Sequence, residues 1–268
     1  MDNDLSGRMK KDWNERAEND PLYWTVSAPL DGPGSWDVDA YFQSGERCLR
    51  TSLDFFLTDE DTAGAALEIG CGAGRVSQAL ALRFPWVHAL DVSPVMLGKA
   101  KQFAQERGVQ NIEWHEGDGL GAQVPGLHGQ ISTVYSTLVL SHIPDPLVQV
   151  QYIKDIGWLL EPEGKFLITL YDDHAGYERT KRTWNMARET GVPDGWHDWT
   201  ADVLPSYETF IRTPIPHDAV NAAMEAGGLR WATIGGEGTD MWMIAGRKTP
   251  PTIILETSQA EMAIEQAH

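Results

Sequence analysis

A glycine-rich turn at residues 70–74 constrains the fold of this chain more than any other feature. The segment 66–74 reads Ala-Leu-Glu-Ile-Gly-Cys-Gly-Ala-Gly, so an apolar run ends at the turn, and a helical pattern starts directly after it. Glycines permit positive φ angles and let a ligand approach the backbone closely. On open parallel sheets, ligands bind at the carboxyl ends of strands. The turn therefore predicts a strand–turn–helix unit that binds a ligand.

The spacing of the turn limits which ligand it suits. A phosphate-binding loop would end in Gly-Lys-Ser or Gly-Lys-Thr, and no such sequence follows. A dinucleotide site favours Gly-x-Gly-x-x-Gly, but Arg75 stands where the third glycine would be. Glu68, at the end of the strand, would repel a pyrophosphate and suits a ligand that carries an ammonium and a sulfonium. A tight turn that binds nothing is the alternative.

Short apolar runs alternate with helical stretches on both sides of this turn, which predicts a parallel sheet covered on both faces. After residue 213, a helix and two strands follow; the strands are joined by a glycine-rich turn that favours an antiparallel pair. The expected strands are 65–69, 87–91, 111–115, 131–136, 164–171, 229–235 and 240–247, and the expected helices are 8–19, 38–57, 74–84, 94–107, 146–160 and 216–226.

Two acids follow later strands. Asp91 ends the second strand about 20 residues after the first glycines, the distance at which an acid accepts hydrogen bonds from ribose hydroxyls. A helix N-cap is the alternative role, although Ser93 serves it better. Asp118-Gly119 follows the third strand, where a carboxylate can accept from an adenine amino group; an ordinary Asp-Gly turn explains it as well.

Together these turns resemble the class I methyltransferases that use S-adenosylmethionine. Residues 135–145 resemble the fourth motif of that family, and Pro162-Glu163-Gly164-Lys165 resembles the turn into its fifth strand. The resemblance implies an α/β, Rossmann-like, doubly wound seven-stranded sheet, mostly parallel with an antiparallel edge hairpin. It also implies S-adenosylmethionine as cofactor, with S-adenosylhomocysteine as product. The cofactor-binding residues it implies are Tyr23, Trp24, Glu68, Gly70, Cys71, Gly72, Gly74, Asp91, Val92, Met96, Asp118, Gly119, Ser136 and Thr137.

His142, just beyond the fourth strand, is the candidate general base. A hydroxyl acceptor must lose a proton, and an unperturbed imidazole can take one near neutral pH. The alternative is a structural histidine that caps the helix near Pro144 or packs on the cofactor. We therefore expect O-methylation, with C- or N-methylation and a non-catalytic S-adenosylmethionine-binding protein as alternatives. A dinucleotide oxidoreductase is the third hypothesis.

Aromatic residues outside the core motifs suggest a substrate pocket. The segment 172–213 is rich in Asp, His, Arg and Trp, and the N-terminal segment resembles the lid of bacterial small-molecule methyltransferases, with Tyr23 and Trp24 over the ligand. Asp172, Asp173 and His174, with His197 and Asp198, are candidate ligands for Mg²⁺ or another metal, but a solvated loop explains them as well, and we assign no residue to a metal. The residues expected to bind the acceptor are Trp13, Tyr171, Trp196 and His197.

These features divide the chain of 268 residues into five parts. The parts are a helical lid at 1–60, the cofactor-binding α/β core at 61–171, the pocket insertion at 172–213, the end of the core sheet at 214–248 and a tail at 249–268.

Charge and cysteine content point to a small-molecule enzyme of the cytoplasm. The formal net charge is −18, with 39 acidic against 21 basic residues, and no basic cluster stands out. This composition argues against nucleic acid and anionic membranes as partners. Cys48 and Cys71 are expected to be free thiols. No apolar run reaches the ~20 residues of a membrane span, and the start lacks a signal-peptide pattern. We expect a monomer or homodimer that binds a small methyl acceptor.

Overall fold

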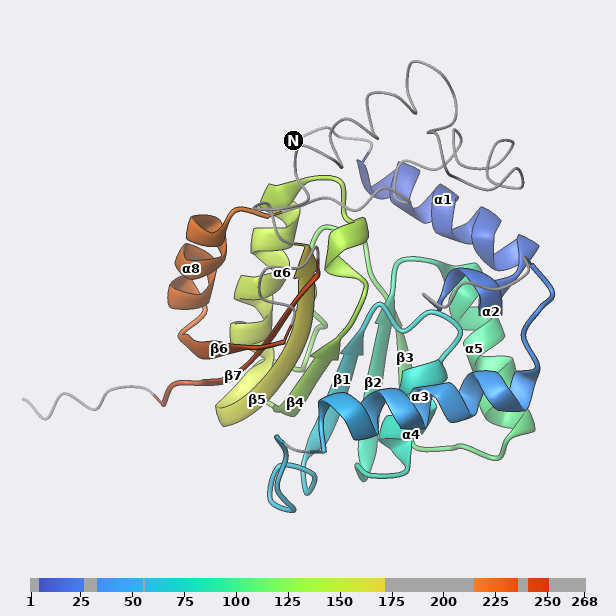
Figure 1. Ribbon diagram of the computed structural model, residues 1–268, viewed down its shortest axis with the longest axis horizontal. Coiled ribbons are helices and arrows are strands. Elements are labelled where there is room, and N and C mark those ends of the chain that lie inside the picture. The colour runs from blue at the N-terminus through green and yellow to red at the C-terminus, as the bar shows by residue number, and fades with distance from the viewer. Residues whose placement is uncertain (1–4, 27–32, 55, 172–214, 236–240, 251–268) are drawn as a thin grey trace, which may run out of the picture.

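The computed structural model describes residues 5–26, 33–54, 56–171, 215–235 and 241–250. Its centre is a seven-stranded sheet of strand order β3-β2-β1-β4-β5-β7-β6. Strands β1 to β5 are parallel, and β7 runs antiparallel to both β5 and β6. This arrangement confirms the predicted fold (Figure 1). The strands are β1 (Ala65–Ile69), β2 (Trp86–Asp91), β3 (Ile112–Glu116), β4 (Ile131–Ser136), β5 (Leu160–Tyr171), β6 (Leu229–Gly235) and β7 (Met241–Lys248).

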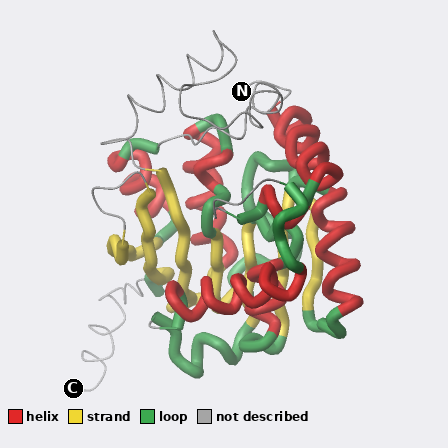
Figure 2. Tube along the Cα trace, turned by 45° about the vertical axis from the view of Figure 1, so that its right-hand side comes forward, coloured by secondary structure: helices red, strands yellow, loops and turns green. Residues whose placement is uncertain are grey.

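Helices cover both faces of the sheet, as Figures 1 and 2 show. Neighbouring residues of β1 point to opposite faces: Ala66 packs with α3 and α4, and Leu67 packs with α6 and α8. Within the described part of the chain, no helix is long and apolar enough to cross a membrane. The helices are α1 (Leu5–Asn19), α2 (Pro21–Trp24), α3 (Val38–Ser52), α4 (Arg75–Ala81), α5 (Pro94–Glu106), η1 (Leu140–His142), α6 (Pro146–Leu159) and α8 (His217–Ala226).

Side-chain caps explain where several helices begin. The Ser93 hydroxyl accepts from the Met96 amide at 3.0 Å at the start of α5, as predicted. The side chain of Asp145 caps α6 and accepts from the Leu147 amide, so this cap is not His142. A side chain that accepts from the first amides of a helix satisfies donors that have no partner within the helix.

The element bounds differ from prediction mainly at helix ends and in β5. Helix α3 ends at Ser52 rather than 57, because the chain turns after Leu53. Strand β5 begins at Leu160 rather than 164, and its pairing with β4 shifts register between Ile131 and Thr133. The bulge includes Glu163, whose φ is +66°. The one-turn helix α2 was not predicted; Asp20 caps it by accepting from two backbone amides.

Candidate functional site

The glycine turn between β1 and α4 is closely packed on two sides. Gly70, Gly72 and Gly74 have φ angles of 71°, 53° and 83°. A Cβ at Gly70 would lie 2.4 Å from the methyl groups of Val139, and one at Gly72 would lie 2.6 Å from Cγ2 of Thr25. The turn is therefore confined between the segment after β4 and the N-terminal segment, and side chains at these positions would not fit.

Asp91 ties the end of β2 to this turn. Its Oδ2 accepts from the Gly72 amide at 2.8 Å, and its Oδ1 accepts from the Ser93 amide at 2.9 Å. Burial raises the pKa of Asp91, whereas these backbone hydrogen bonds lower it. A carboxylate has about four lone-pair sites, so each oxygen can accept one further hydrogen bond. The predicted ribose-binding acid thus also organises the turn.

Glu68, at the end of β1, points toward helix α4. The Ser77 hydroxyl donates a hydrogen bond to its Oε2. Burial raises the pKa of Glu68 to about 8, although the Ser77 hydrogen bond lowers it. Burial therefore favours the neutral carboxyl group and opposes the negative charge expected at this position. The hydrogen bond between Glu68 and Ser77 therefore links the end of β1, next to the glycine turn, to α4.

Three other predicted cofactor residues have side chains that serve packing. Cys71 is a buried free thiol beside Ala89. Met96 is 1% exposed and lies in the cluster beneath α1 and α2. Ser136 donates its hydroxyl to the carbonyl of Ile69 at 3.1 Å. The side chains of these three residues are therefore used for packing and hydrogen bonding within the protein.

Helix α1 lies across the carboxyl ends of β2 and β3 (Figure 1). Its side chains contact residues at or just after these strand ends, close to the predicted acids Asp91 and Asp118. The contacts are a hydrogen bond from Ser6 to the Asp118 carbonyl, an ion pair of Lys10 with Glu116, and a 2.7 Å hydrogen bond from Ser93 to Asn14 Oδ1.

Asp118 and Gly119 form the turn at the end of β3. The Asp118 side chain accepts from the Leu120 amide at 2.8 Å, which is the Asp-Gly turn considered above. Gly119 has a φ of 78°, and its Cβ position would lie 3.1 Å from Val92 and 3.2 Å from Met9 of α1. The predicted residues Val92 and Gly119 therefore lie close together beneath α1.

His142 and Trp13 come together from distant parts of the sequence. Their ring centroids are 5.7 Å apart with an interplanar angle of 82°, so one ring edge faces the other ring. The backbone before His142 is constrained, since Leu138 has a φ of 62° and its amide donates to the Thr169 hydroxyl at 2.7 Å. The Arg16 guanidinium lies 4.4 Å from the centroid of the Trp13 ring.

The remaining predicted residues are placed as follows. Tyr23 and Trp24 form an edge-on ring pair in α2, with centroids 5.2 Å apart. Thr137 is half-buried just after β4, and Tyr171 is 8% exposed at the end of β5. Trp196 and His197 lie outside the described residues, as do Asp172, Asp173 and His174.

Ser6, Asn14 and Thr25, which contact the strand ends or the glycine turn, were not among the predicted site residues. A signal for two of them exists, because Ser6, Lys10 and Asn14 follow each other at intervals of four and so share one helix face. Thr25 has no such signal: its contact with Gly72 arises only when the N-terminal segment folds back over the turn.

Comparison with known proteins, like the sequence motifs, indicates a likeness to methyltransferases. Residues 66–164 match a family described as a methyltransferase domain. A ubiquinone biosynthesis O-methyltransferase of Xanthomonas euvesicatoria pv. vesicatoria (strain 85-10) is 33% identical over 138 residues, which are 50% of this chain and 55% of that protein. The chain thus spans about half the length of the curated relatives it matches.

Solved structures share the fold at lower identity. Magnesium protoporphyrin IX methyltransferase (ChlM) from Synechocystis PCC 6803, with bound SAH, is similar with a TM-score of 0.59 and 15% identity, over 90% of this chain and 98% of that one. The (4+2)-cyclase SpnF is similar with a TM-score of 0.56 and 13% identity, over 91% of this chain and 96% of that one. The fold is therefore shared by proteins named for different reactions.

Proposed function

We propose that this chain, whose residues 66–164 match a family described as a methyltransferase domain, transfers a methyl group from S-adenosylmethionine to a hydroxyl oxygen of a small molecule, with His142 as general base. One observation carries the proposal. Helix α1 covers the strand ends that hold Asp91 and Asp118, and it brings Trp13 against His142 at the same edge of the sheet.

The residues present fit the cofactor. The turn consists of backbone alone at Gly70 and Gly72, where positive φ angles and the neighbouring Val139 and Thr25 leave no room for a Cβ. Asp91 keeps acceptor capacity for ribose hydroxyls, and Asp118 lies in the turn two residues after the neighbouring strand β3, where an adenine amino group would bind. When bound, S-adenosylmethionine supplies an electrophilic methyl group on a sulfonium. The aromatic faces of α2 suit such a cation.

His142 would accept the hydroxyl proton of the acceptor on an imidazole nitrogen. General bases of this kind contribute roughly 10²–10⁴-fold to the rate. The Trp13 ring limits how the imidazole can turn, and α1 shields the site from water. Orientation matters here, because displacement requires an acceptor atom held in line with the leaving group.

The choice of oxygen as acceptor atom rests on His142 and on relatives named as O-methyltransferases. The net charge of −18 disfavours polyanionic acceptors such as nucleic acid.

A protein that binds the cofactor without methyl transfer is the second candidate function. The likeness to a cyclase favours it, because the fold alone does not specify methyl transfer.

The test is turnover of the full chain with S-adenosylmethionine and a panel of small phenols, alcohols and carboxylic acids, read as S-adenosylhomocysteine formed. His142→Gln should lower kcat by roughly 10²–10⁴ while the Kd for S-adenosylmethionine stays the same. His128→Gln is the matched control, because His128 packs on Trp158, with ring centroids 4.8 Å apart, and has no part in the proposed chemistry.

Three results would argue against the proposal. A loss of tenfold or less in His142→Gln would make His142 a structural residue. Cofactor binding without turnover across the panel would favour a sensor or assembly role. Binding of NAD but not of S-adenosylmethionine would reject the methyltransferase assignment altogether.

A further inference from the structure

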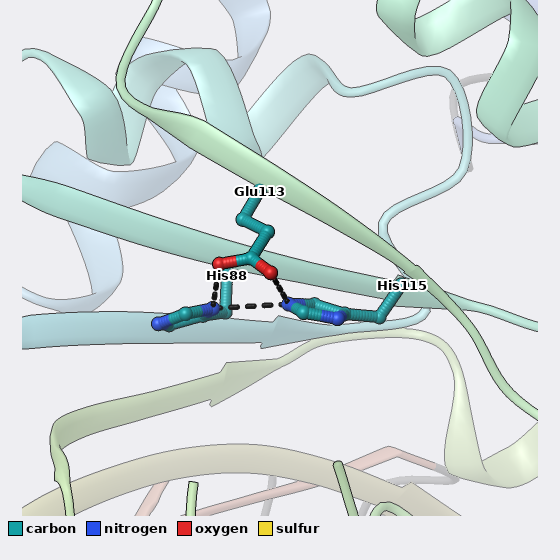
Figure 3. Close-up of side chains that lie close together, drawn as sticks. All are labelled: His88, Glu113 and His115. Atoms are coloured by element: carbon teal, nitrogen blue, oxygen red, sulfur yellow. Dashed lines mark hydrogen bonds and ion pairs between the residues drawn. The ribbon is translucent and has the colours of Figure 1, made fainter. Parts of the chain in front are cut away.

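Three side chains with metal-ligating atoms gather on one face of the sheet edge formed by β2 and β3 (Figure 3). His88 of β2 is paired in register with Glu113 of β3, and His115 follows two residues later. Residues i and i+2 of a strand share a face, so both histidines and the carboxylate point the same way. The site lies apart from the glycine turn and from His142 in the sequence and uses none of the proposed catalytic residues.

The distances suit a single small cation. His88 Nδ1 lies 3.0 Å from His115 Nε2, and the carboxylate oxygens of Glu113 lie 3.5 Å from the first nitrogen and 3.9 Å from the second. Ligands at 2.0–2.1 Å from a tetrahedral Zn²⁺ are separated by about 3.3 Å. The three ligand groups need to move only by tenths of an ångström to surround an ion.

The environment favours metal binding as well. His88 is 7% exposed, so its imidazole lies in the protein interior, whereas the Glu113 side chain is 54% exposed and gives ions a path from solvent. Neutral imidazoles are the form that binds metal. Two imidazoles with a carboxylate form a donor set that suits zinc.

We propose that His88, Glu113 and His115 bind one divalent transition-metal ion, Zn²⁺ in the first instance, with a fourth position open to water. The ion would join β3, the edge strand, to β2. His88 stands three residues before Asp91, and His115 stands three residues before Asp118. A metal here would therefore fix the two strand ends relative to each other. The proposal does not depend on the proposed methyl transfer.

The experiment is titration of the full chain, freed of metal by chelation, with ZnCl₂ at pH 7.5 by calorimetry. We expect one equivalent to bind with a Kd of about 10⁻⁶ M or tighter. Zinc at a hundredfold excess over its Kd should raise Tm by roughly 5–10 °C. Cobalt(II) should give the visible spectrum of a four-coordinate ion. Zinc binding weaker than about 1 mM in the unmodified chain would overturn the proposal.

Variants assign the binding to these residues. His115→Gln should weaken zinc binding by roughly a hundredfold, and Glu113→Gln by about tenfold, while His128→Gln binds as the unmodified chain does. Glu113 is mostly exposed, so its variant tests the site even if a histidine variant fails to fold. A cobalt spectrum unchanged in Glu113→Gln would contradict the proposed ligand set.

A second control addresses the histidines of the 172–213 segment. The double variant His174→Gln, His197→Gln removes both of them and should leave the zinc affinity unchanged. Loss of the bound zinc in this double variant, with binding retained in His115→Gln, would place the metal in that segment and overturn the assignment.

Discussion

Replacing Glu68 with glutamine should make the protein more stable at alkaline pH. The Glu68 side chain is fully buried and hydrogen-bonded to Ser77, and burial raises its pKa from an ordinary value of 4.5 to about 8. Between these two pH values the folded protein binds the proton that the unfolded chain releases. Stability from this group is therefore fully present below pH 4.5 and is lost as the pH rises to 8.

The size of the effect follows from the shift. A change from 4.5 to about 8 is about 3.5 pKa units, and each unit corresponds to 1.36 kcal/mol, so the ionised carboxylate lowers the free energy of unfolding by about 5 kcal/mol above pH 8. Glutamine keeps an oxygen that can accept from Ser77 and carries no charge at any pH. Glu68→Gln should thus resemble the unmodified protein near pH 4.5 and exceed its stability by several kcal/mol at pH 9.

Urea unfolding of both proteins at pH 5, 7 and 9 measures this difference, because contributions of the other titrating groups cancel between them. Glu225→Gln, at an exposed position of α8, is the matched control and should show no such trend. A stability difference that is the same at all three pH values would refute the reasoning, since it would mean that Glu68 does not titrate between 4.5 and 8.

Two further predictions concern the glycine turn. Gly72→Ala places a Cβ 2.6 Å from Thr25 in a residue with φ of 53°, so it should lower the free energy of unfolding by about 2–4 kcal/mol in urea titrations. In a Thr25→Ser background, which removes the contacting methyl group but keeps the hydroxyl bonded to Tyr41, the same change should cost about 1 kcal/mol less; equal costs would contradict the contact. Asp91→Asn should weaken S-adenosylmethionine binding by about 1.5–3 kcal/mol in calorimetry, and an unchanged affinity would exclude its ribose role.

The sheet, and the sheet edge that carries the candidate site, could be predicted from the sequence because both depend on local sequence patterns. Apolar runs that end in glycine or aspartate mark the carboxyl ends of strands, and these ends meet at one edge in a parallel sheet. Asp91 and Asp118 were predicted at this edge for that reason, and His142 because it follows the fourth strand; helix α1 contacts residues at or just after all three strand ends in the structure.

The directions of individual side chains were not predictable in this way. Glu68 belongs to the glycine motif, yet its pairing with Ser77 depends on how α4 packs against β1. The cluster of His88, Glu113 and His115 depends on the register of β2 and β3, and a slip of one residue would turn His115 to the opposite face. Register follows from the packed sheet as a whole, so a local pattern in one strand does not reveal it.

The position of α1 has a consequence for how the chain folds. The contacts of this helix with the strand ends join residues 79 to 129 positions apart, from Asn14 with Ser93 to Trp13 with His142. Closing such long loops is slow compared with forming neighbouring strand–helix units. Helix α1 precedes β2 and β3 in the chain, so it must wait for both strands before it can dock. A nascent chain would expose the strand ends of the candidate site until this late step, when α1 covers them.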